Sequence, residues 1–150
     1  MNTKRVLSLL CALLVAGALR AQVAAPAFGP DDRLKIAQLT DTHLDLGTPY
    51  RRAEAEKTLA QLRAVLEAER PDLVLFTGDV VTGRPAREAW ERLVAVLAEY
   101  RTPFCVVLGN HDAEQDLTRA EIARIVTSAP GSLNRLDAAG ELADLVLEVP

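Results

Sequence analysis

Residues 73–79 read LVLFTGD, and this short stretch does most to decide the fold. Its first four residues form a continuous apolar run, which is typical of a strand buried on both faces of a sheet. A second apolar run occupies residues 104–108, and a strand is also predicted over residues 34–39, which read LKIAQL. Residues 142–149 alternate in a way that predicts a fourth strand. Longer segments with helical spacing separate these runs. Such alternation predicts a layered α/β domain, in which helices flank a mainly parallel sheet through right-handed crossovers.

The helices are predicted from apolar spacing and from the residues at their ends. Residues 51–69 place apolar side chains on one face and charged side chains on the other. A second helix is expected to begin near Pro85 and to bury Trp90 in the core. Thr118 followed by Glu121 is a capping-box signature for a third helix.

The N-terminus has the features of a secretory signal peptide. Lys4 and Arg5 precede an apolar stretch over residues 6–19, and small residues suited to cleavage follow it. We therefore predict a leader over residues 1–21, a linker over 22–32, and a secreted or periplasmic protein. A membrane anchor is less favoured, because about 14 apolar residues are too few to span a bilayer comfortably.

Charge and cysteine content exclude several kinds of partner. The formal charge is −4, and removal of the leader leaves 14 basic and 21 acidic residues, a charge of −7. This balance argues against binding a nucleic-acid backbone, which calls for a basic face. Two leucines precede Cys11, which disfavours a lipoprotein site. Cys105 lies in an apolar run, so we expect a buried, inert thiol and no intramolecular disulfide after cleavage.

Three polar segments each follow one of the predicted strands. They are DTH at residues 41–43, GD at 78–79 and GNHD at 109–112, and together they contain both histidines of the chain. Ligands of parallel α/β sheets sit beyond the carboxyl ends of the strands. Each segment alone is a weak signal, but their common position predicts a single site.

The residue types in these segments are suited to binding cations. Asp41 and His43 combine a carboxylate with an imidazole, a pairing that suits zinc, manganese or iron. The Asp79 carboxylate has two oxygens and can bridge two ions, although an aspartate at this position can also cap the next helix. Asn110 offers a neutral carbonyl oxygen.

His111 is the candidate proton donor. It is placed to protonate a leaving alkoxide or to stabilise phosphoryl oxygens, and Asp112 is expected to hold its imidazole in the required tautomer. The alternative is a simple turn, because Gly-Asn is good turn chemistry. Its position directly after a buried strand favours a functional role.

The ordered set DTH, GD and GNHD resembles the calcineurin-like metallophosphoesterase superfamily. The segment from residue 108 to residue 121 is most similar to the branch of certain purple acid phosphatases and their fungal relatives. The resemblance covers residues 33–150. It implies that Asp41, His43 and Asp79 bind one metal, that Asp79 and Asn110 bind a second, and that His111 is the catalytic acid. The implied cofactors are two divalent ions (Mn, Zn or Fe), and the implied reaction is two-metal hydrolysis of a phosphoester.

The chain departs from the family pattern at two places. Thr82 stands where purple acid phosphatases carry a tyrosine ligand, which favours a divalent pair over an iron–tyrosinate site. No histidine follows His111, so the further histidine and the GHxH segment of the family are absent from these 150 residues. We therefore predict the N-terminal part of a phosphoesterase domain with weak activity by itself. The alternative is a truncated or degenerate domain that binds metal or phosphate without catalysis; hydrolysis of another class of ester is less favoured.

Overall fold

The computed structural model describes residues 23–150, which form a three-stranded parallel sheet and three helices. The elements in chain order are β1 (Ile36–Leu39), α2 (Pro49–Glu69), β2 (Leu73–Thr77), α3 (Ala86–Tyr100), β3 (Phe104–Val107) and α4 (Arg119–Ser128). The strands lie side by side in the order β1-β2-β3, with Ile36 opposite Leu73 and Val74 opposite Phe104. The predicted α/β class with a parallel sheet is confirmed. The predicted leader, with Cys11, lies outside the described residues.

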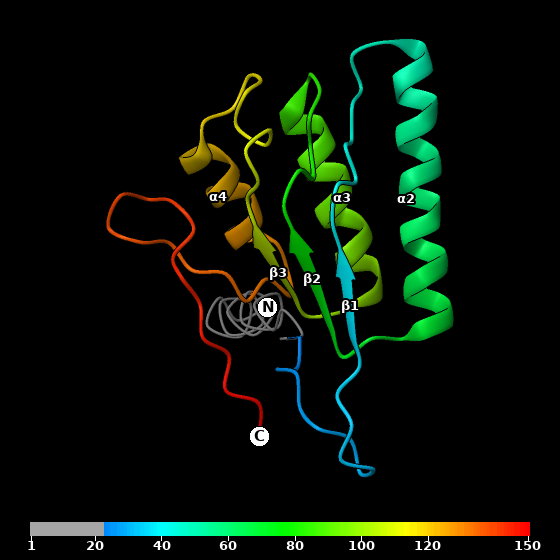
Figure 1. Ribbon diagram of the computed structural model, residues 1–150, viewed down its shortest axis with the longest axis vertical. Coiled ribbons are helices and arrows are strands. Elements are labelled where there is room, and N and C mark those ends of the chain that lie inside the picture. Colours follow the sequence, from blue (N-terminus) through cyan, green and yellow to red (C-terminus); the bar gives the residue numbers. More distant parts are fainter. Residues whose placement is uncertain (1–22) are drawn as a thin grey trace, which may run out of the picture.

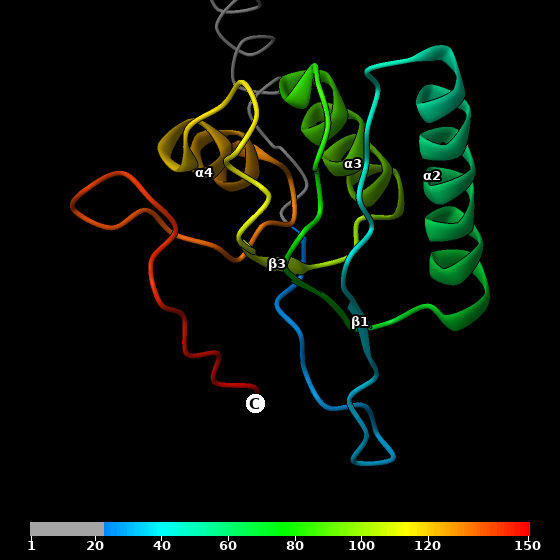
Figure 2. The same cartoon turned by 45° about the horizontal axis from the view of Figure 1, so that its top comes forward.

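The helices all cover the same face of the sheet, as the two cartoon views show (Figures 1 and 2). Alternate strand residues, among them Phe76 of β2 and Phe104 of β3, are buried against these helices. Trp90 of α3 is fully buried in the same core, which confirms its predicted role. Cys105 is buried as well.

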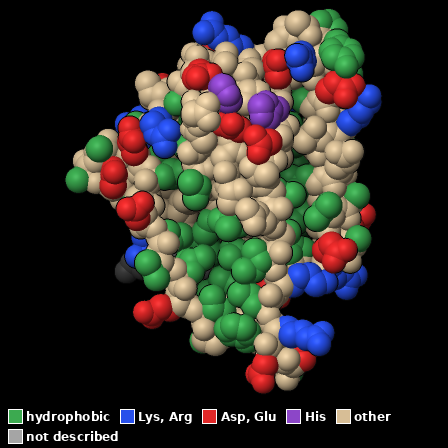
Figure 3. Space-filling view, viewed as in Figure 1, with side chains coloured by type: hydrophobic (Ala, Val, Ile, Leu, Met, Phe, Trp, Pro, Cys, Tyr) green, Lys and Arg blue, Asp and Glu red, His purple; other side chains and the backbone are tan. Residues whose placement is uncertain are grey.

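The other face of the sheet remains partly open. Ile36 is 50% exposed and Val107 is 57% exposed, although both belong to strands. Figure 3 shows apolar side chains gathered over this face. The C-terminal segment covers part of it, because Leu145 and Leu147 line a cleft together with Leu75 of β2. Within residues 23–150, helices therefore cover one side of the sheet only.

The helix ends follow local chemistry. The Thr48 side chain accepts a hydrogen bond from the Arg51 amide at 3.1 Å, so α2 begins two residues before the predicted start. The predicted capping box of α4 is confirmed: the Glu121 carboxylate accepts from the Thr118 amide at 2.8 Å, and the Thr118 hydroxyl accepts from the Glu121 amide at 3.2 Å. Within residues 23–150, no helix has the length and apolar character needed to cross a membrane.

The predicted strand over residues 142–149 is wrong. Among the described residues, this segment makes only an isolated antiparallel bridge between Leu142 and Leu136. The free edge of β3 is already occupied, because the Leu133 amide donates to the Phe104 carbonyl at 2.9 Å. The Asn134 side chain then bonds both the amide and the carbonyl of Val106, at 2.8 and 2.9 Å. An alternating segment forms a strand only where a free edge is available to pair with it.

Candidate metal centre

The three polar segments meet beyond the carboxyl ends of the strands. Residues 41–43 follow β1, residues 78–79 follow β2 and residues 109–112 follow β3. The space-filling view shows the two histidines beside each other at the upper edge of the sheet, with acidic side chains next to them (Figure 3). The predicted convergence is therefore present.

Backbone pairing beyond the strands places the first two segments. The Asp41 amide donates to the Gly78 carbonyl at 3.0 Å, and the His43 amide donates to the Asp79 carbonyl at 3.1 Å. Asp41, His43 and Asp79 all have left-handed backbones, with φ of 53°, 47° and 52°. Such conformations are uncommon for residues other than glycine, and they cluster at functional sites.

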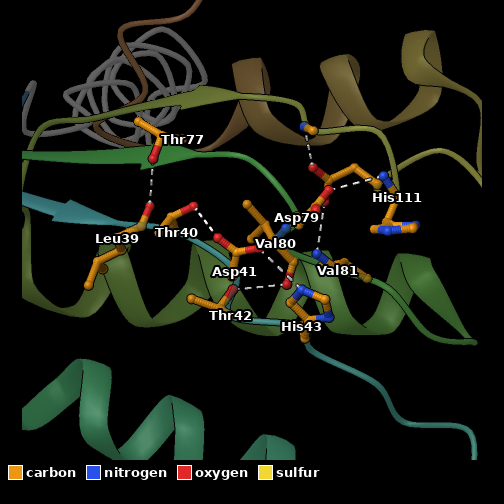
Figure 4. Close-up of polar contacts among 12 residues, drawn as sticks. Leu39, Thr40, Asp41, Thr42, His43, Thr77, Asp79, Val80, Val81 and His111 are labelled. Atoms are coloured by element: carbon orange, nitrogen blue, oxygen red, sulfur yellow. Dashed lines mark hydrogen bonds and ion pairs between the residues drawn. The ribbon is translucent and has the colours of Figure 1, made fainter.

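The side chains of these three residues form a compact donor cluster. One ligand atom from each of Asp41, His43 and Asp79 lies within 4.8 Å of the other two. Nε2 of His43 is 3.5 Å from a carboxylate oxygen of Asp41, and Figure 4 shows the two side chains pointing toward each other. Two carboxylates and an imidazole fit zinc, manganese or iron.

Asp41 is kept in the form that binds a cation. The Thr40 hydroxyl donates to its carboxylate at 2.6 Å. This hydrogen bond, with a smaller contribution from His43, holds the pKa of Asp41 below its usual range. The ionised carboxylate therefore persists at neutral and mildly acidic pH.

Close backbone approach brings the third segment onto Asp79. A Cβ on Gly109 would lie 2.2 Å from a carboxylate oxygen of Asp79 and 2.5 Å from its amide nitrogen. The His111 amide donates to that same carboxylate at 3.0 Å. Asp79 is thus in contact with the loop after β3 as well as with the loop after β1, and glycine at 109 permits this approach.

Asp112 has a different role from the predicted one. Its carboxylate is fully buried and accepts from the amides of Val80, Val81 and Gly109 at 2.8, 2.9 and 2.8 Å. These bonds fasten the loop after β3 to the loop after β2. The expectation that Asp112 holds the His111 imidazole is wrong, because its oxygens are directed to the backbone.

Glu114 contacts the His111 ring instead, and the sequence reasoning missed it. A carboxylate oxygen of Glu114 is 2.6 Å from Nδ1 of His111. This contact raises the pKa of His111 above its usual value. An acidic residue three positions after a histidine in a turn is the signal that could have identified it. The His111 ring lies beside His43, with 6.3 Å between ring centroids; Asn110 is exposed next to it.

The three polar segments lie within the part of the chain that matches a known protein family. Residues 34–142 match the family model described as calcineurin-like phosphoesterase. The chain is similar to an uncharacterized protein of Schizosaccharomyces pombe, with 36% identity over 131 residues, 78% of this chain and 26% of that protein. It is similar to phosphatase DCR2 of Saccharomyces cerevisiae, with 35% identity over 116 residues, 69% of this chain and 20% of that protein.

A third relative carries a name that bears on activity. The chain is 32% identical over 123 residues to an Arabidopsis thaliana protein named probable inactive purple acid phosphatase 28, covering 73% of this chain and 31% of that protein. The chain therefore spans between about a fifth and a third of the length of these three relatives.

Proposed function

Because the chain belongs to the calcineurin-like phosphoesterase family, we propose that it supplies part of a metal-dependent phosphoester hydrolase. The observation that carries the proposal is the donor cluster of Asp41, His43 and Asp79, whose ligand atoms lie within 4.8 Å of one another. The two segments that form it are separated along the chain and are brought together by the parallel strands and by backbone hydrogen bonds just beyond them. The cluster stands at the strand ends, where parallel α/β sheets bind ligands.

In this proposal the cluster holds one divalent ion, and Asp79 with Asn110 contributes to a second. Such a pair supplies Lewis-acid polarisation of the phosphoryl group and a nucleophile at neutral pH. Asp79 suits the shared position because its carboxylate accepts from the loop after β3 and also lies within 4.8 Å of the ligand atoms of Asp41 and His43. The identity of the two ions as manganese, zinc or iron is part of the proposal. So are the remaining ligands of the pair, because no histidine follows His111 in these 150 residues.

His111 serves as the proton donor. Its ring lies beside His43 at the edge of the cluster, and the Glu114 carboxylate at Nδ1 raises the pKa of His111 in the metal-free chain. A protonated imidazole at this position can transfer its proton to the leaving oxygen of a phosphoester. We place His111 in this role and assign Asp112 to loop positioning.

A second candidate function is a domain that binds a cation without catalysis. One observation favours it: a relative is named probable inactive purple acid phosphatase 28. Under this alternative the donor cluster still binds an ion, but hydrolysis does not follow. The two candidates therefore share the first experiment below and separate at the second.

The first experiment is calorimetric titration of zinc and of manganese into the full 150-residue chain. Asp79→Asn removes a donor from the cluster, whereas the control Asp31→Asn alters an exposed aspartate near the opposite end of β1. We expect a loss in affinity of about tenfold or more for Asp79→Asn, and none for the control. Equal affinity in all three proteins would contradict a metal site at the cluster.

The second experiment is hydrolysis of an aryl phosphate with added manganese. We expect weak turnover by the wild type, because only part of a two-ion ligand set is present, and none above background by His111→Ala. Metal binding together with wild-type turnover no higher than that of His111→Ala would favour the non-catalytic alternative.

We also propose that the chain is exported, on the basis of its leader pattern alone. The mass of the protein recovered from a secreting host tests this point. Loss of about the first 21 residues is the expected result, and an intact Met1 terminus would contradict it.

A further inference from the structure

The contact between Glu114 and His111 is local and specific. Glu114 follows His111 by three residues in a turn that the Glu114 amide closes on the His111 carbonyl at 3.2 Å. The same turn brings the Glu114 carboxylate to 2.6 Å from Nδ1 of His111. Asp112, which follows His111 in the sequence, uses its carboxylate to accept hydrogen bonds from three backbone amides. Glu114 therefore occupies the place that Asp112 was expected to fill.

We propose that Glu114 is the positioning residue of His111. Its carboxylate accepts from Nδ1–H, which fixes the ring orientation and the tautomer of the neutral imidazole. Nδ1 and Nε2 lie on different edges of the ring, so a ring held at Nδ1 leaves Nε2 free for substrate. The proposal rests on the function proposed above, because Nε2 is the atom that would meet the leaving oxygen.

The His111–Glu114 pair is exposed, so it contributes little to the stability of the fold. The His111 side chain is 45% exposed and the Glu114 side chain 53%. Exposed ion pairs contribute little to folding stability, so Glu114→Ala should fold like the wild type. The His111 backbone is also held independently of Glu114, because its N–H group donates a hydrogen bond to the Asp79 carboxylate at 3.0 Å. In Glu114→Ala we therefore expect the His111 ring to lose its fixed orientation while the backbone of the loop stays unchanged.

The test is a long-range proton–nitrogen NMR spectrum of the metal-free chain at about pH 9, where imidazoles are neutral. The chain has two histidines, so His43 serves as an internal control. We expect His111 of the wild type to show the Nδ1–H pattern, and Glu114→Ala to lose it while His43 is unchanged. Glu67→Ala, an exposed glutamate of α2, should retain the wild-type spectrum. The same His111 pattern in wild type and Glu114→Ala, or an Nε2–H pattern in the wild type, would overturn the proposal.

Zinc titration of the same proteins separates positioning from ligation. Glu114→Ala should keep the wild-type zinc affinity to within about twofold, because the Glu114 carboxylate contacts the His111 imidazole and is not one of the three donors of the cluster. A tenfold loss would make Glu114 a metal ligand and would overturn the positioning role. The NMR pattern is read without metal or substrate, so its failure is distinguishable from failure of the proposed hydrolase function, which the Asp79→Asn titration tests.

Discussion

Replacing Gly109 with alanine is expected to displace the Asp79 carboxylate and to weaken cation binding. The added Cβ would lie 2.2 Å from a carboxylate oxygen of Asp79, where ordinary contact begins at 3.4 Å, a shortfall of about 1.2 Å. Rotation of the Asp79 side chain cannot relieve it, because the backbone nitrogen of Asp79 would be only 2.5 Å away. The loop after β3 and the loop after β2 must therefore move apart.

The magnitude follows from the tolerance of metal sites. Ligand distances in such sites hold to within about 0.2 Å, so a displacement near 1 Å removes Asp79 as an effective ligand. We expect zinc affinity to fall by about 10-fold to 100-fold. We also expect a loss of about 1–3 kcal/mol in the free energy of unfolding, as is usual for overpacking.

Calorimetric zinc titration and urea unfolding of the same samples measure the two effects. Gly29→Ala is the matched control, since its nearest obstacle would be the flexible Asp31 side chain at 3.0 Å. That control should change neither zinc affinity nor stability appreciably. If Gly109→Ala kept both quantities at wild-type values, the inferred close approach of the two loops would be refuted.

The remaining predictions concern Asp112, Cys105 and His111. Asp112→Asn places an amide N–H group against backbone donors in a buried site and should lower the free energy of unfolding in urea by about 2–3 kcal/mol. A loss no larger than that of Asp144→Asn, at an exposed position of the C-terminal segment, would contradict the role of Asp112 in fastening the two loops. Burial raises the pKa of the Cys105 thiol to about 11. The buried thiolate is disfavoured, so stability should fall as pH rises from about 9 toward 11, and thiol reagents at pH 8 should modify the folded chain far more slowly than the urea-unfolded chain; equal rates would refute this. Glu114 raises the pKa of His111, so Glu114→Gln should lower that pKa in an NMR titration of the metal-free chain. The stabilisation of protonated His111 is present at low pH and is lost as pH rises through its folded pKa; an unchanged pKa would exclude the Glu114 contact as its cause.

The sequence was most informative where one local cause decides the structure. The apolar run at 73–76 became β2 because its residues suit a buried strand, and Thr118 with Glu121 capped α4 because the capping box needs only neighbouring atoms. The convergence of the three polar segments followed from parallel strand order, which brings all carboxyl ends to one edge. These features required no knowledge of distant packing.

The two wrong predictions depended on competition that spacing does not reveal. Residues 142–149 have a strand pattern, but Leu133 and Asn134 already occupy the available edge of β3. Asp112 is adjacent to His111 in sequence, yet the buried amides after β2 bind its carboxylate. In both places two groups could have bonded to the same partner, and the positions of the loops in the folded protein decided which of them did so.

The site residues lie far apart along the chain, so an ion bound to them would affect folding as well as chemistry. Val80, next to Asp79, pairs with Thr42, 38 residues earlier, and Asp79 pairs with His111, 32 residues later. An ion that bound Asp41, His43 and Asp79 would link residues that lie far apart along the chain. These residues are close together in the folded chain and not in the unfolded chain, so the ion would bind the folded chain more tightly. Mass action would then favour folding by about 2.7 kcal/mol at a free ion concentration one hundred times Kd. The strand β1 is short, with four residues, so a bound ion would add to the forces that hold it in place. The yield of folded protein would then rise with the concentration of the cation, as in small domains that fold around a structural metal.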